Sequence, residues 1–111
     1  MRSMIRVCPL VAILTMFASL ASAQDLANKG KDVYAAQKCS VCHAVAGAGN
    51  KKGSLDGVGT KLSADEIRSW ITDAKGMTAK TKATRKPEMK AYTLPKDDVD
   101  GLVAYLSSLK K

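Results

Sequence analysis

The sequence predicts an all-α fold, and two observations support this. Two stretches carry apolar side chains at helical spacing, one over residues 67–74 and one over residues 99–109. No stretch alternates apolar and polar residues for long enough to form a strand. The segment 44–60 is rich in glycine and has no apolar period, so we expect it to be a loop.

Residues 1–23 have the features of a secretory leader. Arg2 and Arg6 flank the start of an apolar run over residues 7–20, and the segment closes on Ala-Ser-Ala. This run is shorter than the roughly 20 residues that cross a bilayer. We therefore expect export to the periplasm, cleavage of the leader, and no stable membrane insertion of the remaining domain, residues 24–111. An uncleaved leader that tethers the chain to the membrane is the alternative.

The remaining domain is small and basic. A domain near its size buries only about 60–65% of its unfolded surface, and usually needs a disulfide, a metal or a bound group for stability. Cys8 leaves with the leader, so two cysteines remain. Without Arg2 and Arg6, the domain has 16 basic and 10 acidic side chains. A basic exported protein is expected to meet acidic protein surfaces rather than nucleic acid.

The first and last expected helices have clear apolar stripes. The first covers residues 25–38, with Asp25 as a suitable N-cap. Its stripe consists of Leu26, Gly30, Val33 and Tyr34. The last helix has Pro95 in its first turn, and Asp97 and Asp98 complement its positive end. Its stripe consists of Val99, Leu102, Val103, Leu106 and Leu109, flanked by Tyr105.

A middle helix is expected to begin at Ser63. Ser63 and Glu66 form an S-x-x-E capping box, in which each side chain satisfies a free backbone N–H. Gly76 is suited to a left-handed stop at the end of this helix. Residues 77–93 are basic and have no clear period, and Pro87 disfavours a helical residue before it. We expect this segment to be a long loop that is either functional or disordered.

Residues 39–43 read Cys-Ser-Val-Cys-His and contain the only histidine. A redox pair of the thioredoxin type needs a βαβ scaffold, and a structural zinc site usually needs two such cysteine pairs. The C-x-x-C-H pattern is instead typical of haem attachment, because two thioether bonds hold the porphyrin and the next histidine lies beneath the iron. We predict one haem c, covalently bound through Cys39 and Cys42, with His43 as an iron ligand; a disulfide and zinc are the alternatives.

Two methionines of the domain could bind the other face of the iron. Met89 follows Pro87 in an extended stretch before the last helix, so a short loop can place its sulfur over the ring. Met77 directly follows the expected helix stop. We predict that Met89 is the second ligand; Met77 and an open coordination position are the alternatives.

Together these motifs resemble the class I c-type cytochromes, which are small soluble monohaem electron carriers. The likeness covers nearly all of residues 25–111. Its motifs are G-K-D-V-Y-x4-C-S-V-C-H at 30–43, L-D-G-V-G-T-K-L-S at 55–63, P-E-M-K at 87–90 and L-V-A-Y-L-S-S-L-K at 102–110.

The resemblance implies a cytochrome c-like fold, with three to four helices around one haem. It also implies that Met89 is the axial methionine, and that Gly30 and Tyr34 pack on the last helix beside Tyr105. One position departs from the family: Ser54 stands where many relatives have a proline whose carbonyl accepts the imidazole N–H. The sequence therefore does not predict the partner of that nitrogen.

The resemblance implies an electron carrier rather than an enzyme. Ligation by His43 and Met89 saturates the iron, so a one-electron shuttle between respiratory or dehydrogenase partners is the expected function. Lysines of segment 75–90 are expected to flank the haem edge and steer acidic redox partners toward it. We expect a monomer. The alternatives are a five-coordinate haem enzyme or gas sensor, and a haem subunit of a periplasmic dehydrogenase.

Overall fold

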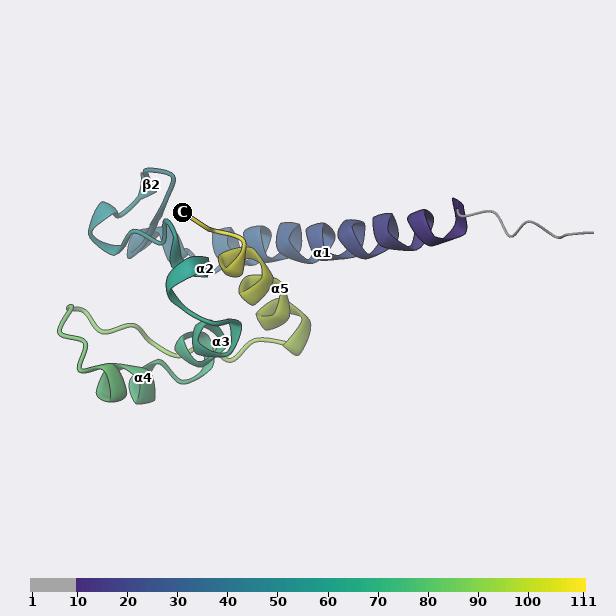
Figure 1. The fold of residues 1–111 in the computed structure, drawn as a ribbon. Helices are drawn as coiled ribbons and strands as arrows, with labels where there is room; N and C mark the ends of the chain where they lie inside the picture. The colour runs from purple at the N-terminus through teal and green to yellow at the C-terminus, as the bar shows by residue number, and fades with distance from the viewer. Residues whose placement is uncertain (1–9) are drawn as a thin grey trace, which may run out of the picture.

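The structure, a computed structural model, describes residues 10–111, and side chains from Ser22 onward. Its α-helices are α1 (Leu10–Ala36), α2 (Val58–Lys61), α3 (Ala64–Thr72), α4 (Ala74–Thr81) and α5 (Lys96–Ser107) (Figure 1). Two 3-10 helices, η1 (Cys39–Val41) and η2 (Lys51–Gly53), lie between α1 and α2. The all-α prediction is confirmed. The expected loop 44–60 is not wholly irregular: it contains a small antiparallel hairpin of β1 (Ala44–Val45) and β2 (Ala48–Gly49), the 3-10 helix η2 and the start of α2.

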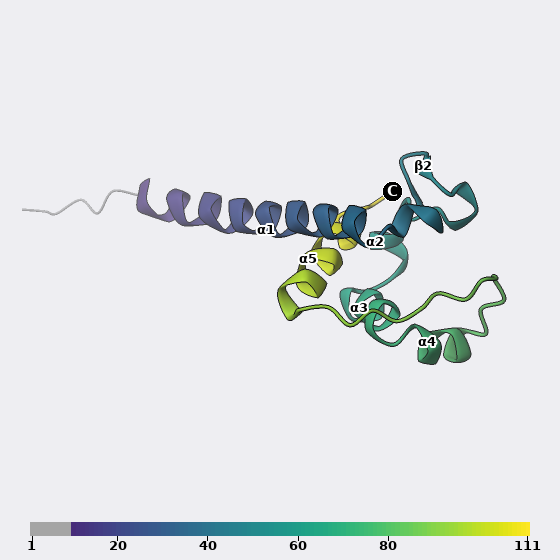
Figure 2. The same cartoon turned by 180° about the vertical axis from the view of Figure 1, so that it is seen from behind.

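Helix α1 is the longest element, and its N-terminal part projects away from the other helices (Figures 1 and 2). Its 27 residues correspond to a length of about 40 Å. The predicted start at residue 25 is wrong, because the helix begins at Leu10 and continues through the expected cleavage site. Residues 1–9 of the predicted leader lie outside the described residues, so cleavage remains a prediction. Within residues 10–111, no helix has both the length and the apolar character for crossing a membrane.

Helices α1 and α5 cross at two glycines. A Cβ atom on Gly30 would overlap the Gly101 carbonyl and would lie 2.8 Å from the Leu102 nitrogen. One turn further along α1, the rings of Tyr34 and Tyr105 meet edge to face, with centroids 5.7 Å apart and planes at 70°. The predicted packing of Gly30 and Tyr34 on the last helix is therefore confirmed.

Helix α3 packs against this helix pair and completes the core. The buried side chains of this core cluster come from α1, α3 and α5, namely Val33, Tyr34, Ile67, Ile71, Val99, Leu102 and Val103. The predicted capping box is present, because Ser63 Oγ accepts from Glu66 N and Glu66 Oε1 accepts from Ser63 N, both at 3.1 Å. The capping residues thus fix where α3 begins, and its apolar face fixes how it packs.

Helix α3 ends earlier than predicted, and α4 follows it directly. The predicted stop at Gly76 is wrong, because Asp73 caps a new helix and its Oδ1 accepts from Gly76 N at 3.3 Å. A Cβ on Gly76 would overlap the Asp73 carboxylate, so the glycine leaves room for the cap. Residues 77–81 of the expected loop are therefore helical. The loop begins at Lys82, whose φ of 55° ends α4 in the left-handed region.

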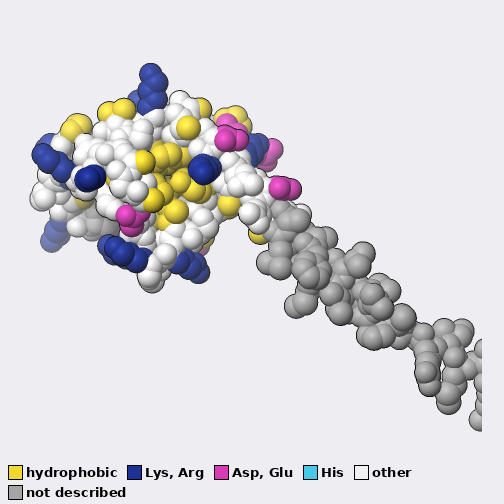
Figure 3. Space-filling view, turned by 90° about the horizontal axis from the view of Figure 1, so that it is seen from above, with side chains coloured by type: hydrophobic (Ala, Val, Ile, Leu, Met, Phe, Trp, Pro, Cys, Tyr) yellow, Lys and Arg dark blue, Asp and Glu magenta, His cyan; other side chains and the backbone are white. Residues whose placement is uncertain are grey.

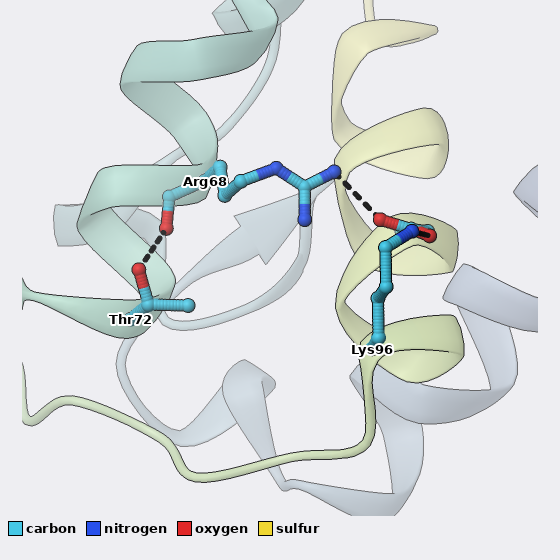
Figure 4. A network of polar contacts seen from close by, with 4 residues as sticks. Arg68, Thr72 and Lys96 are labelled. Carbon is cyan, nitrogen blue, oxygen red and sulfur yellow. Dashed lines mark hydrogen bonds and ion pairs between the residues drawn. The ribbon is translucent and has the colours of Figure 1, made fainter.

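A polar network joins α3 to α5 (Figure 4). Asp100 accepts from Arg68 Nη2 at 2.7 Å and from Lys96 Nζ at 2.6 Å. Thr72 Oγ1 donates to the Arg68 carbonyl at 2.9 Å. The hydrogen bonds from Lys96 and Arg68 hold the pKa of Asp100 below its usual range. These contacts lie at the surface and support the packing of the two helices.

Candidate functional site

A cavity of about 500 Å³ lies among α1, α3, α5 and the segment that follows α4. This volume falls within the usual range for pockets that hold cofactors. Its apolar wall includes Leu55, Val58, Leu62, Ile67, Trp70, Ile71, Leu102 and Leu106. The four predicted site residues, Cys39, Cys42, His43 and Met89, also line it. The fold therefore brings two thiols, an imidazole and a thioether to one apolar cavity.

The cysteine motif reaches the cavity through a sharp turn after α1. Lys38 adopts a left-handed φ of 55°, and η1 begins at Cys39. The Cys39 carbonyl then accepts from Cys42 N at 3.2 Å and from His43 N at 2.9 Å. This winding places all three motif side chains against the same cavity. Both cysteines are free thiols, and burial raises the pKa of Cys39.

The His43 ring is oriented by one backbone hydrogen bond. Its Nδ1 lies 2.9 Å from the Gly53 carbonyl, and since a carbonyl can only accept, Nδ1 carries the proton. The other ring nitrogen, Nε2, then has its lone pair available for a metal. Burial lowers the pKa of His43. The hydrogen bond to Gly53 raises this pKa, and the charge of Arg85 lowers it further, so the net shift is downward. The acceptor that the sequence did not predict is thus Gly53, one residue before Ser54.

The chain after the motif folds back over it. Asn50 N donates to the carbonyls of Ser40 and His43, at 3.1 and 3.0 Å, and Asn50 Nδ2 donates to Val41 at 3.2 Å. Leu55 N donates to the Ala44 carbonyl at 2.8 Å. Residues 39–55 therefore form one hydrogen-bonded unit that holds His43 in place.

The two candidate methionines occupy different environments. Met89 is half-buried and lines the cavity, on the irregular segment between α4 and α5. Met77 is 8% exposed, belongs to α4 and does not line the cavity. The location of Met89 is the one expected of a ligand, whereas Met77 packs as an ordinary buried side chain.

Sequence reasoning missed two residues of the site, Arg85 and Tyr92. Arg85 and Tyr92 line the cavity, and Tyr92 N donates to the Ile71 carbonyl at 2.8 Å. Neither has a spacing that sets it apart in the sequence; Arg85 differs only in being the single arginine among lysines of that segment. Trp70 of α3 lines the cavity as well.

The zinc alternative has no cluster of ligands to support it. In the part of the chain that the structure describes, no group of three or more His, Cys, Asp or Glu side chains is arranged to hold a metal ion. Haem, in contrast, needs only what the cavity provides: two thiols for covalent attachment, an imidazole with a free Nε2, and apolar walls. The residues present therefore fit a covalently bound haem.

The basic segment that contains Met89 carries exposed charges, which are those of Lys75, Lys80, Lys82, Lys86 and Lys90, and Lys90 lines the cavity. Lys86 pairs with Glu88 at 2.7 Å, and Lys90 Nζ lies 5.5 Å from the centre of the Tyr92 ring. On one face of the molecule, hydrophobic side chains gather near the middle, and basic and acidic side chains lie around them (Figure 3).

Comparison with known proteins identifies the family. Residues 27–110 match the model of the family described as cytochrome c, so the chain belongs to this family. It is a c-type cytochrome, an electron-transfer haem protein, and its small size fits the monohaem class I. The family match implies a covalently bound haem c with iron, and Cys39 and Cys42 lie where the attachment motif belongs.

One curated relative is the "Cytochrome c oxidase subunit 2" of Alkalihalophilus pseudofirmus, which is 28% identical over 96 residues. The match covers 78% of this chain and 27% of the relative, so the chain spans about a quarter of that protein's length. No solved structure matches the chain.

Proposed function

We propose that residues 24–111 form a one-electron carrier with a single haem c. Cys39 and Cys42 attach the haem through thioether bonds, and His43 and Met89 ligate its iron. When bound, the haem accepts and releases one electron without a change in covalent bonds. The observation that carries this proposal is the convergence of these four side chains on one apolar cavity.

The protein's own residues give the haem its environment. Gly53 holds His43 in the tautomer that leaves Nε2 free. The apolar walls from α3 and α5 would exclude water from the bound haem, and Met89 would supply a thioether ligand to its iron. A thioether ligand raises the reduction potential relative to a second imidazole. With both axial positions filled, electron transfer through the haem edge is the chemistry left to the site.

Absorption spectra of the purified protein test this proposal. We expect a pyridine-haemochrome spectrum of c-type haem, a sulfur–iron band in the red region of the oxidised spectrum, and a redox titration that fits one electron. Carbon monoxide should not bind the reduced protein at neutral pH. Rapid carbon monoxide binding together with no sulfur–iron band would favour the alternative, a five-coordinate haem enzyme or gas sensor.

A second candidate role is that of a subunit or domain within a larger electron-transfer complex. The relative in Alkalihalophilus pseudofirmus bears the name of an oxidase subunit and matches this chain over about a quarter of its own length. This supports a place for the domain beside an oxidase or a dehydrogenase. Co-purification of the tagged chain from its native membrane and soluble fractions separates a complex subunit from a free carrier.

We further propose that the domain works in the periplasm after loss of residues 1–23. The charged start, apolar run and small-residue end of that segment support this. Mass spectrometry of the secreted protein should find an N-terminus at Gln24. An N-terminus at Met1 in the membrane fraction would instead indicate a tether.

Acidic redox partners are proposed to dock against segment 75–90. Because Lys86 already pairs with Glu88, Lys80 and Lys82 are expected to contribute most of the attraction. Reversal of charge at Lys80, Lys82 and Lys86 together should slow electron transfer several-fold at low salt, and less at high salt. Reversal at Lys31, Lys61 and Lys110, three exposed lysines outside segment 75–90, is the control. A rate that does not depend on salt contradicts docking at this segment.

A further inference from the structure

The segment that carries Met89 has few ties to the rest of the protein. At its start, Ala83 N donates to the Thr78 carbonyl at 3.1 Å, and at its end Tyr92 N donates to Ile71 at 2.8 Å. Within residues 10–111, the intervening residues 84–91 make one hydrogen bond to another segment, from Arg85 Nη2 to the Cys42 carbonyl at 2.6 Å. Arg85 thus links the Met89 segment to the cysteine motif, 43 positions earlier in the chain.

The Cys42 carbonyl is distinctive among those of the motif. Over residues 39–43, the carbonyls of Cys39, Ser40, Val41 and His43 accept from donors within residues 42–50. Only the Cys42 carbonyl accepts from a distant segment. The local fold of the motif leaves this acceptor free, and Arg85 is the donor that satisfies it.

The Arg85 guanidinium also lies directly over Gly53. A Cβ on Gly53 would overlap Arg85 Nη1 and the Cys42 carbonyl, and would lie 2.9 Å from Arg85 Cζ. Gly53 is the residue whose carbonyl orients His43. The permanent positive charge of Arg85 therefore lies against Gly53, the residue that accepts the hydrogen bond from the proposed iron ligand. Arg85 itself also lines the cavity.

We propose that Arg85 is a positioning residue that ties the Met89 segment to the His43 side of the cavity, and that its charge favours the reduced haem. This inference rests on the proposed ligation by His43 and Met89. Reduction adds one electron, delivered by the redox partner or an electrode, and lowers the charge of the iron by one. A nearby cation is repelled less by ferrous than by ferric iron, so it raises the reduction potential.

The test uses the haem-loaded protein with Arg85→Gln, which removes the charge and shortens the side chain, and Arg85→Lys, which keeps the charge. Since Arg85 is exposed, neither change is expected to prevent folding. Lys110→Gln is the control for net charge. We expect Arg85→Gln to lower the ferrous-to-ferric ratio at a fixed potential about three- to tenfold, where tenfold corresponds to 59 mV. Arg85→Lys should restore most of this ratio.

The tie is tested separately by heating. The sulfur–iron band should disappear at a lower temperature in Arg85→Gln than in Lys110→Gln, because the Met89 segment detaches more readily. If Arg85→Gln equals Lys110→Gln in either the reduction potential or the thermal loss of the band, the proposal is wrong. A wild-type protein that lacks the band contradicts Met89 ligation itself, which distinguishes the two failures.

Discussion

On the His43 side of the cavity, backbone hydrogen bonds fix residues 39–55 as one unit; on the Met89 side, residues 84–91 have one hydrogen bond to another segment. The His43 ring is held by a carbonyl of its own unit, at 2.9 Å. Met89 has no such local support, and depends on the ends of its segment and on Arg85. The two proposed axial ligands are therefore positioned by different means. The first is preorganised by the fold, and the second is secured by a few long-range contacts and by the iron.

The largest expected effect is the loss of the sulfur–iron absorption band when Met89, but not Met77, is replaced. Met89→Leu should abolish the red-region sulfur–iron band, because leucine has no sulfur to bind the iron. The haem should remain covalently attached, because Cys39 and Cys42 are unchanged. Met77→Leu, a change of the same kind in α4, should keep the full band. Absorption spectra of both oxidised variants measure this. A full band in Met89→Leu would transfer the ligand role away from Met89.

Two glycines of the hairpin test how strongly the His43 side is fixed. Gly47 and Gly49 both have positive φ, at 82° and 111°, so alanine is strained at either. A Cβ on Gly49 would also overlap the His43 carbonyl and lie 3.0 Å from the Ser40 carbonyl. A Cβ on Gly47 would have no such neighbour within 4 Å. We expect Gly49→Ala to lower the free energy of unfolding by about 3 kcal/mol and Gly47→Ala by about 1 kcal/mol.

Chemical denaturation of the loaded protein measures both free energies. Equal losses for the two alanine variants would show that residues 39–55 tolerate displacement of the motif carbonyls. The His43 side would then be no more rigid than the Met89 side.

The crossing of α1 and α5 supports both sides of the cavity, so substitutions at its two glycines should destabilise both sides alike. Gly30→Ala places a methyl group against the Gly101 carbonyl, which outweighs the gain in helix propensity and costs about 2 kcal/mol. Gly101→Ala meets Gly30 at 3.0–3.3 Å and is expected to cost less than 1 kcal/mol. Thermal unfolding midpoints check the difference. A larger loss in Gly101→Ala would contradict the close approach at Gly30.

The smallest effect is expected at the surface network of Asp100, away from both sides. Because Lys96 and Arg68 lower the pKa of Asp100 in the folded state, its ionised form stabilises the fold above the ordinary aspartate pKa of about 3.9. This contribution is lost as the pH falls through the lowered folded pKa. The stability difference between wild type and Asp100→Asn should thus be present at pH 7 and vanish in strong acid. Asp32→Asn, at an exposed position within α1, is the control; a difference that persists in strong acid would have another cause.

The sequence predicted the elements whose signals are local. The capping box at Ser63 and the apolar stripe of the last helix each depend on residues within a few positions, and the start of α3 and the position of α5 agree with the prediction. The predicted helix stop at Gly76 is wrong, because glycine usually ends helices but here makes room for the cap from Asp73. The start of α1 was placed too late, because a leader boundary was expected where the helix is continuous.

The candidate site was predictable to the extent that its chemistry is written in one motif. Cys39, Cys42 and His43 are adjacent in the sequence, and Met89 followed from the scarcity of other ligands. Gly53 and Arg85 could not be predicted, because their roles depend on contacts across 10 and 43 positions. Such contacts are set by how the loops close over the cavity, which no local pattern encodes.

The mass of the purified protein tests the central claim most directly. The chain should be produced with a cytochrome c maturation system, exported, and measured intact under denaturing conditions. The account predicts the mass of residues 24–111 plus one haem, and loss of that increment when Cys39 and Cys42 are both replaced by serine. A wild-type mass equal to that of the bare polypeptide would contradict it.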